Sequence, residues 1–274
     1  MRRPQIFLNT CLRSAKFVVK TALYALVPGG FGYYRKLQQQ KTAEYIHERD
    51  KHPVREKHHG EGGWKEVDAD GVQKRDYADY DEYLTHQKLK LDEMLKTKGG
   101  FSNEDVLNFR LKFYDRFRHL IPLLKENAVV LCCGARQGTE VEVLRDIGFP
   151  NAYGIDLNPG KDNPWVRPGD FMHLDAKDNS LDLLYSNCVD HAFDLDGFFA
   201  EHHRAIKPDG YVLYELGTNM EGGGGAFEAV SWSRTEDVLM RLLRLYEDLI
   251  HVERDEQWLW VLLKGKRPVA PKQG

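Results

Sequence analysis

The segment from Ala128 to Gly160 constrains the fold more than any other part of the chain. It begins with the apolar run AVVLCC, which is typical of a parallel strand buried on both faces. Gly134 and Gly138 bracket a turn, residues 139–146 have helical spacing of apolar side chains, and residues 152–155 form a second strand-like run. This order of elements predicts a parallel βαβ unit.

A carboxylate closes the second strand of this unit. Asp156 lies about 20 residues past the first glycine, where an acid can accept hydrogen bonds from both hydroxyls of an adenosine ribose. The glycine turn would let such a ligand approach bare backbone and the free amides of the following helix. A tight turn that binds nothing is the alternative, and the acid at this spacing favours a cofactor site.

The turn resembles the first motif of the class I S-adenosylmethionine-dependent methyltransferases, and the resemblance extends over residues 101–266. The chain reads LCCGARQG from Leu131, so the first and third glycines of the family motif are present. Cys132 replaces the family's acid and Arg136 replaces its middle glycine. The resemblance implies an S-adenosyl-L-methionine site, with Glu140 compensating for the missing acid near the cofactor's ammonium group. The residues of this motif that the resemblance assigns to the cofactor site are Cys133, Gly134, Ala135, Arg136, Gly138 and Glu140.

Later motifs support the same resemblance. Asp156-Leu157 matches the family's ribose-binding acid and the apolar residue beside the adenine, and Asp170-Phe171-Met172 matches the adenine loop. Ser186 and Asn187 lie where the strand at residues 181–186 ends, and the family places that end against the cofactor. A helix at residues 195–206, a KPDG turn and a strand at residues 211–216 follow in the family's order.

The C-terminal part completes the predicted fold. Apolar spacing predicts a helix over residues 235–249, and two strands at residues 249–254 and 258–264 flank the short polar turn at 255–257. We therefore predict an α/β fold with a doubly wound, seven-stranded, mostly parallel and Rossmann-like sheet. Its last strand is antiparallel, as the resemblance implies. The predicted units are a partly helical extension (1–100), the cofactor-binding domain (101–267) and a tail (268–274).

The loop after the strand at 181–186 carries the candidate catalytic residues. Parallel sheets bind ligands outside the carboxyl ends of their strands, so this loop would face the methyl acceptor. His191 is the candidate base, with Asp190 as an alternative base or as the residue that orients it. The structural alternative is that His191 bonds a neighbouring loop and Asp190 caps the next helix. Both interpretations stay open.

Residues 1–43 are basic and partly apolar, with no acid before Glu44. This pattern is consistent with a peripheral membrane helix, an import presequence or a helix covering the catalytic domain. Residues 44–75 are polar and are predicted as a linker or surface loop. Helices are predicted over residues 77–96 and after Ser102.

Two further features near the acceptor side have open roles. The phenylalanines of the second of these helices, at 109, 113 and 117, are predicted as core. The glycine run at 222–225 is either a mobile lid or an ordinary loop, and Trp232 lines the acceptor pocket or the core.

Composition narrows the function class. A formal net charge of −3 argues against a surface that coats nucleic acid. The four cysteines include no CxxC pair, which favours a reducing cytoplasm, and the adjacent histidine pairs give little support for a metal site. The resemblance implies a methyl acceptor, which we expect to be a small molecule, a glycan or a lipid-linked group. Composition does not indicate an oligomeric state.

The sequence patterns are compatible with three functions. The first is methyl transfer from S-adenosyl-L-methionine, and the second is non-catalytic binding of the same cofactor by a regulatory or scaffolding module. The departures at Cys132 and Arg136 motivate the second. A nicotinamide-dependent oxidoreductase is disfavoured by the missing middle glycine and by the C-terminal hairpin.

Overall fold

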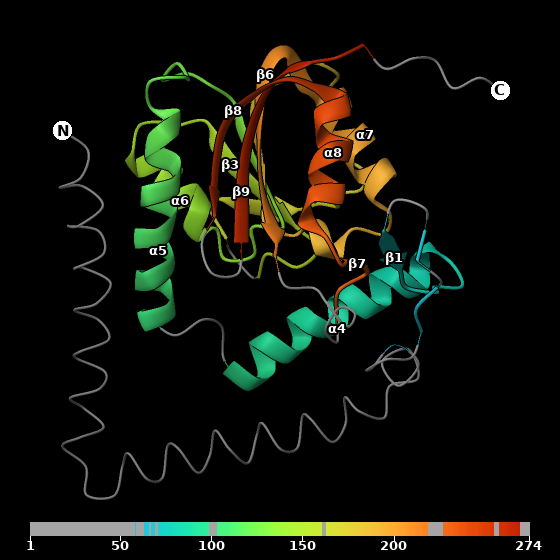
Figure 1. The fold of residues 1–274 in the computed structure, drawn as a ribbon. Helices are drawn as coiled ribbons and strands as arrows, with labels where there is room; N and C mark the ends of the chain where they lie inside the picture. The colour runs from blue at the N-terminus through green and yellow to red at the C-terminus, as the bar shows by residue number, and fades with distance from the viewer. Residues whose placement is uncertain are drawn as a thin grey trace, which may run out of the picture.

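A seven-stranded sheet organises this protein (Figure 1). The computed structural model describes residues 58, 63–65, 67–68, 71–98, 103–160, 163–218, 227–254 and 258–268. The helices are α4 (Tyr80–Lys98), α5 (Asn103–Phe117), α6 (Thr139–Asp146), α7 (Leu195–Ala205) and α8 (Thr235–Leu245), with 3-10 turns η1 (Arg118–Leu120) and η2 (Val189–His191). The strands are β1 (Val72–Lys74), β2 (Val130–Cys133), β3 (Ala152–Asp156), β4 (Val166–Pro168), β5 (Leu181–Ser186), β6 (Ile206–Gly217), β7 (Val230–Trp232), β8 (Tyr246–Arg254) and β9 (Trp258–Lys266).

The strand order of the sheet is β4-β3-β2-β5-β6-β9-β8. The first five strands are parallel, and β9 is inserted antiparallel between β6 and β8. The predicted seven-stranded sheet with an antiparallel last strand is confirmed. The order changes direction between β2 and β5, and at such a point the connections leave a crevice at the carboxyl ends of the strands.

Helices cover both faces of the sheet. In Figure 1, α5 and α6 lie on one side and α7 and α8 on the other. The sheet therefore has one hydrophobic core on each face. Successive side chains of β2 contribute to the two cores in turn, because a strand alternates its side chains between faces. Cys132 packs with the α5 and α6 side, and Cys133 packs with the α7 and α8 side.

Two predicted boundaries differ from the structure. Helix α8 ends at Leu245, and β8 begins at Tyr246 rather than at Leu249. Tyr246 is fully buried in an extended conformation, so tertiary packing overrides the helical periodicity that extends past it. The KPDG residues form a bulge within β6, because Ile206 pairs with Leu181 and Tyr211 pairs with Leu183.

The segment before the sheet contributes to the same packed structure. Strand β1 pairs antiparallel with β7, so the prediction of a linker over residues 44–75 is wrong for residues 72–74. Helix α4 follows and crosses below the carboxyl edge of the sheet in Figure 1. Tyr77 and Tyr83 are buried there against Phe193. These contacts cross the predicted division at residue 101.

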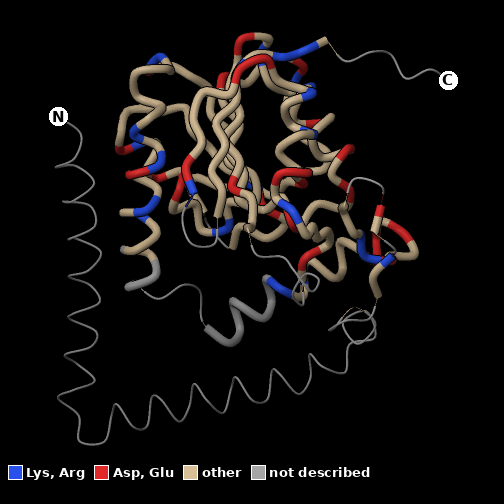
Figure 2. Tube along the Cα trace, in the orientation of Figure 1, with Lys and Arg blue, Asp and Glu red and all other residues tan. Residues whose placement is uncertain are grey.

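Several expectations fall outside the described residues. They are the basic segment 1–43, Ser102, the glycine run at 222–225 and the turn at 255–257. Within the described part of the chain, no helix combines the length and the hydrophobicity that crossing a bilayer requires. Figure 2 shows acidic and basic residues interspersed over these elements.

Candidate functional site

A cavity of about 350 Å³ opens at the carboxyl ends of β2, β3 and β5. It lies at the reversal of strand order, where the fold is expected to bind a ligand. The predicted site residues that line it are Gly134, Ala135, Arg136, Glu140, Asp156, Leu157, Phe171, Asn187, Asp190 and His191. The lining residues that were not predicted as site residues are Gln87, Lys90, Phe109, Phe113, Gln137, Thr139, Cys188, Glu228 and Trp258.

The glycine turn keeps its geometry despite the substituted middle position. Arg136 has φ 44°, in the left-handed region that glycine adopts without strain and other residues adopt at a cost of roughly 1–2 kcal/mol. Gly134 also has positive φ, and a Cβ there would lie 2.7 Å from Cys188 Sγ. Replacement of the family's middle glycine therefore leaves the backbone of the turn in place.

Asp156 links β3 to this turn. Its Oδ2 accepts a hydrogen bond from Arg136 N at 3.0 Å, and its Oδ1 accepts one from Asn158 N at 2.9 Å. Burial raises the pKa of Asp156, and these two bonds oppose that rise. The carboxylate is thus fixed at the wall of the cavity, at the position predicted for a ribose contact.

Glu140 brings a second acid to the cavity. It lies in the first turn of α6 and is only 5% exposed, and burial raises its pKa to about 8. Cys132 is fully buried in the core between the sheet and the α5–α6 layer, so it does not reach the cavity. Glu140 is therefore the carboxyl group available where the family motif would have supplied one.

Five predicted site residues do not line the cavity. Cys133 faces α7, with its Sγ 3.9 Å from His202 Nε2. Ser186 is buried and its Oγ accepts a hydrogen bond from Cys188 N at 3.3 Å. Gly138 begins α6 with φ 80°, and a Cβ there would lie 2.8 Å from Val166 Cγ2. These residues shape the strand ends and the turn behind the cavity wall.

Asp170 and Met172 are the remaining two predicted site residues that do not line the cavity. Tyr80 donates its hydroxyl to Asp170 Oδ2 at 2.6 Å, and Met172 N donates to Asp170 Oδ1 at 2.8 Å. Both carboxylate oxygens of Asp170 thus have partners within the protein. Phe171 of the same loop does line the cavity, whereas Asp170 bonds Tyr80 of α4.

Lys90 and His191 meet in the wall of the cavity. His191 Nδ1 lies 3.0 Å from Phe227 O, so this nitrogen carries the proton and donates it. His191 Nε2 then accepts a hydrogen bond from Lys90 Nζ at 2.5 Å. Burial lowers the pKa of Lys90 to about 8, and burial together with the Lys90 charge lowers the pKa of His191 far below its usual range. His191 is therefore neutral at pH 7.

The two interpretations of the loop are partly resolved. His191 does bond a neighbouring loop, through Phe227 O, while it also lines the cavity. Asp190 does not cap the next helix, because Asp194 accepts from Asp196 N and Gly197 N at the start of α7. Burial raises the pKa of Asp190, with Lys90 opposing the rise.

Five of the lining residues missed from the sequence come from the two helices before the sheet and from β9. The other four are Gln137 and Thr139 at the glycine turn, Cys188 after β5 and Glu228 before β7. Phe113 and Phe117 are buried as predicted, but Phe109 is 37% exposed and lines the cavity. Gln87 and Lys90 share one face of α4 with Tyr83, at spacings of four and seven residues. This mixed polar and aromatic stripe was the available signal. Trp232 lies in the core, where its Nε1 donates to Gly217 O at 2.9 Å.

Comparison with known proteins identifies the fold. A family model described as a methyltransferase domain matches residues 131–214. A crystal structure from Burkholderia thailandensis, of 1,6-didemethyltoxoflavin-N1-methyltransferase with bound 1,6-didemethyltoxoflavin and S-adenosylhomocysteine, superposes with a TM-score of 0.54. It is 18% identical, and the match covers 75% of this chain and 100% of that one. The fold is that of the class I S-adenosylmethionine-dependent methyltransferases.

A sequence relative carries the same kind of domain. Sterol 24-C-methyltransferase of Schizosaccharomyces pombe is 37% identical over 67 residues, which are 24% of this chain. The match spans only 18% of that relative's length. The resemblance stated from the glycine turn is confirmed for the methyltransferase domain and for the fold.

Proposed function

We propose that the protein is an S-adenosyl-L-methionine-dependent methyltransferase that acts on a small-molecule acceptor. The observation that carries this proposal is the cavity at the reversal of strand order, which brings the glycine turn, Asp156 and Glu140 together within a methyltransferase domain. A carboxylate for the ribose hydroxyls and a carboxyl group for the ammonium group are two of the contacts that this cofactor requires.

The residues present fit the cofactor. Asp156 would bind the ribose, Leu157 and Phe171 would flank the adenine, and Glu140 would bind the ammonium group. The fit of Glu140 rests on its burial, because a buried carboxyl with a raised pKa gains from a cationic partner. When bound, S-adenosyl-L-methionine supplies a methyl group on a positively charged sulfur that leaves readily.

Lys90 is the proposed proton acceptor. A hydroxyl or carbon acceptor must lose a proton as it is methylated. In the neutral lysine one N–H donates to His191 Nε2, which leaves the nitrogen lone pair for the acceptor's proton. His191 then orients Lys90, and Phe227 O fixes the tautomer of His191. The role predicted for His191 as base thus becomes one of positioning, and Asp190 Oδ2 lies 3.9 Å from His191 Nε2.

The lining of the cavity favours an acceptor with an apolar part, because Phe109, Phe113 and Trp258 contribute aromatic surface. By their printed names, the matched sequence acts on a sterol and the matched structure holds bound 1,6-didemethyltoxoflavin, and both are small molecules.

Turnover is tested with S-adenosyl-L-methionine carrying a trideuterated methyl group. The purified chain is incubated with pools of ring-containing small molecules, and mass spectrometry detects products that gain the labelled methyl. We expect labelled product together with S-adenosylhomocysteine. Tight cofactor binding without turnover on any acceptor pool would instead favour the non-catalytic module.

The role of Lys90 is tested by pH profiles once an acceptor is found. We expect kcat/KM to rise with pH up to about 8, because Lys90 must be deprotonated to accept a proton. Lys90→Met should lose about 100-fold or more in kcat, the usual scale for a general base. Lys88→Met is the matched control on the exposed side of α4. An unchanged pH profile in Lys90→Met would exclude this role.

A further inference from the structure

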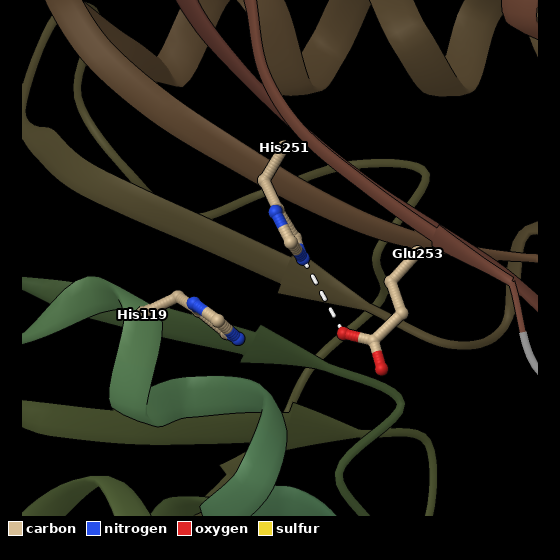
Figure 3. Close-up of side chains that lie close together, drawn as sticks. All are labelled: His119, His251 and Glu253. Carbon is tan, nitrogen blue, oxygen red and sulfur yellow. Dashed lines mark hydrogen bonds and ion pairs between the residues drawn. The ribbon is translucent and has the colours of Figure 1, made fainter.

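A cluster of two histidines and a glutamate lies away from the cavity, between η1 and the edge strand β8. Figure 3 shows the ring of His119 and the side chains of His251 and Glu253 turned toward one another. One ligand atom from each of the three residues lies within 4.8 Å of the other two. His251 and Glu253 are two residues apart on one strand, so their side chains share a face.

His119 has the feature that points to a ligand. Its Nε2 is buried and has no hydrogen-bond partner among the described residues. A buried polar nitrogen left in this state destabilises the fold unless a partner binds to it.

The other two residues complete a set of nitrogen and oxygen ligands. His251 Nε2 and Glu253 Oε2 are 3.3 Å apart. The rings of His119 and His251 are stacked with centroids 4.5 Å apart, so a shared ion requires one ring to rotate. The side chains of His251 and Glu253 are 36% and 61% exposed, which leaves them free to make this adjustment.

The residues around Glu253 carry both signs of charge. Lys112, Arg116 and Arg118 are cationic and Asp115 is acidic, and Arg116 is paired with Glu215. Glu253 also lines a hollow of about 260 Å³, which leaves space for a water or an anion as a fourth ligand. Two imidazoles and one carboxylate are ligands that Zn²⁺ accepts in tetrahedral sites.

We propose that His119, His251 and Glu253 bind a divalent transition-metal ion of the Zn²⁺ type and thereby join η1 to the edge strand β8. The ion would satisfy the buried Nε2 of His119. It would also hold the end of α5, which supplies Phe109 and Phe113 to the cavity, against the last strand of the sheet.

The test is a calorimetric titration of the metal-free full-length chain with Zn²⁺, with Co²⁺ absorption as a second measurement of ligand geometry. His119→Ala and Glu253→Gln should each remove one binding site or weaken it at least about tenfold, since even changes outside the ligand set cost 10- to 100-fold. Glu253→Gln preserves the size of the side chain, so a loss of Zn²⁺ binding in this variant would not be due to unfolding.

Two controls locate the ion. His191→Ala removes a residue of the other candidate group, Asp190, His191 and Glu228, in which Lys90 already contacts His191. His203→Ala removes a histidine on α7 that bonds Arg267 O. Both should bind Zn²⁺ as the unmodified chain does. If His119→Ala and Glu253→Gln give the unmodified isotherm, or if the unmodified chain binds no Zn²⁺, the proposal is overturned.

Discussion

At the scale of single residues, Asp156 is the most direct test of the cofactor site. We expect Asp156→Ala to weaken S-adenosyl-L-methionine binding by about 1.5–3 kcal/mol, the size of hydrogen bonds to a charged group. Part of this loss reflects the turn, because Asp156 also accepts from Arg136 N and Asn158 N. Calorimetry measures the change. The control is Asp182→Ala, because Asp182 lies near the amino end of β5 and does not line the cavity. Equal affinity in a folded Asp156→Ala chain would refute the ribose contact.

We expect Glu140 to make cofactor binding depend on pH. In the free protein its pKa is raised to about 8, so at pH 7 it holds a proton. A bound ammonium group lowers that pKa, so binding releases a proton below pH 8 and the affinity due to this contact rises as pH approaches 8. Calorimetry in buffers of different ionisation enthalpy should show release of close to one proton at pH 7.

The same measurement on two variants isolates Glu140. Glu140→Gln should abolish the release of the proton, because the amide cannot ionise. Glu142→Gln, on the same helix and paired with Arg110, should retain it. Release that persists in Glu140→Gln would assign the proton to another group.

At the scale of elements, a buried ion pair joins α5 to the sheet. Arg116 and Glu215 are 8% and 3% exposed, and Tyr185 also donates its hydroxyl to Glu215. Arg116→Met would leave the Glu215 charge buried without its partner, so we expect a loss of about 3–5 kcal/mol in the free energy of unfolding. Arg118→Met, at an exposed neighbouring position, should change it little.

Chemical denaturation measures these unfolding free energies. Adding Glu215→Gln to Arg116→Met should restore part of the loss, because the buried charge is then absent. A single Arg116→Met variant as stable as the unmodified chain would show that the pair does not hold α5 on the sheet.

The elements differ in how far the sequence predicted them. The turn between Gly134 and Gly138 and the acid at Asp156 depend on local backbone requirements, so their spacing was enough to place them. The end of α8 depends on burial of Tyr246, which no local pattern encodes. The stripe on α4 indicates that Lys90 lies on a packed face, but only the packing of α4 at the carboxyl ends of the strands brings its amine to His191.

At the scale of the whole molecule, the structure bears on the predicted boundary at residue 101. Tyr77 and Tyr83 are buried against the sheet domain, and Tyr83 donates its hydroxyl to His191 O at 2.9 Å. A chain beginning at residue 101 should therefore be less stable than one beginning at residue 56, by roughly 3 kcal/mol or more for two buried aromatic side chains. Urea unfolding of both chains measures the difference. Equal stabilities would support the boundary at 101.

The measurement that tests the central claim most directly is a calorimetric titration of the full-length chain with S-adenosylhomocysteine, the demethylated product, with NAD as the control. If the cavity is the site of an S-adenosylmethionine-dependent methyltransferase, the product binds with micromolar affinity, Asp156→Ala weakens it, and NAD does not bind. Binding of NAD without binding of S-adenosylhomocysteine would contradict the proposed function.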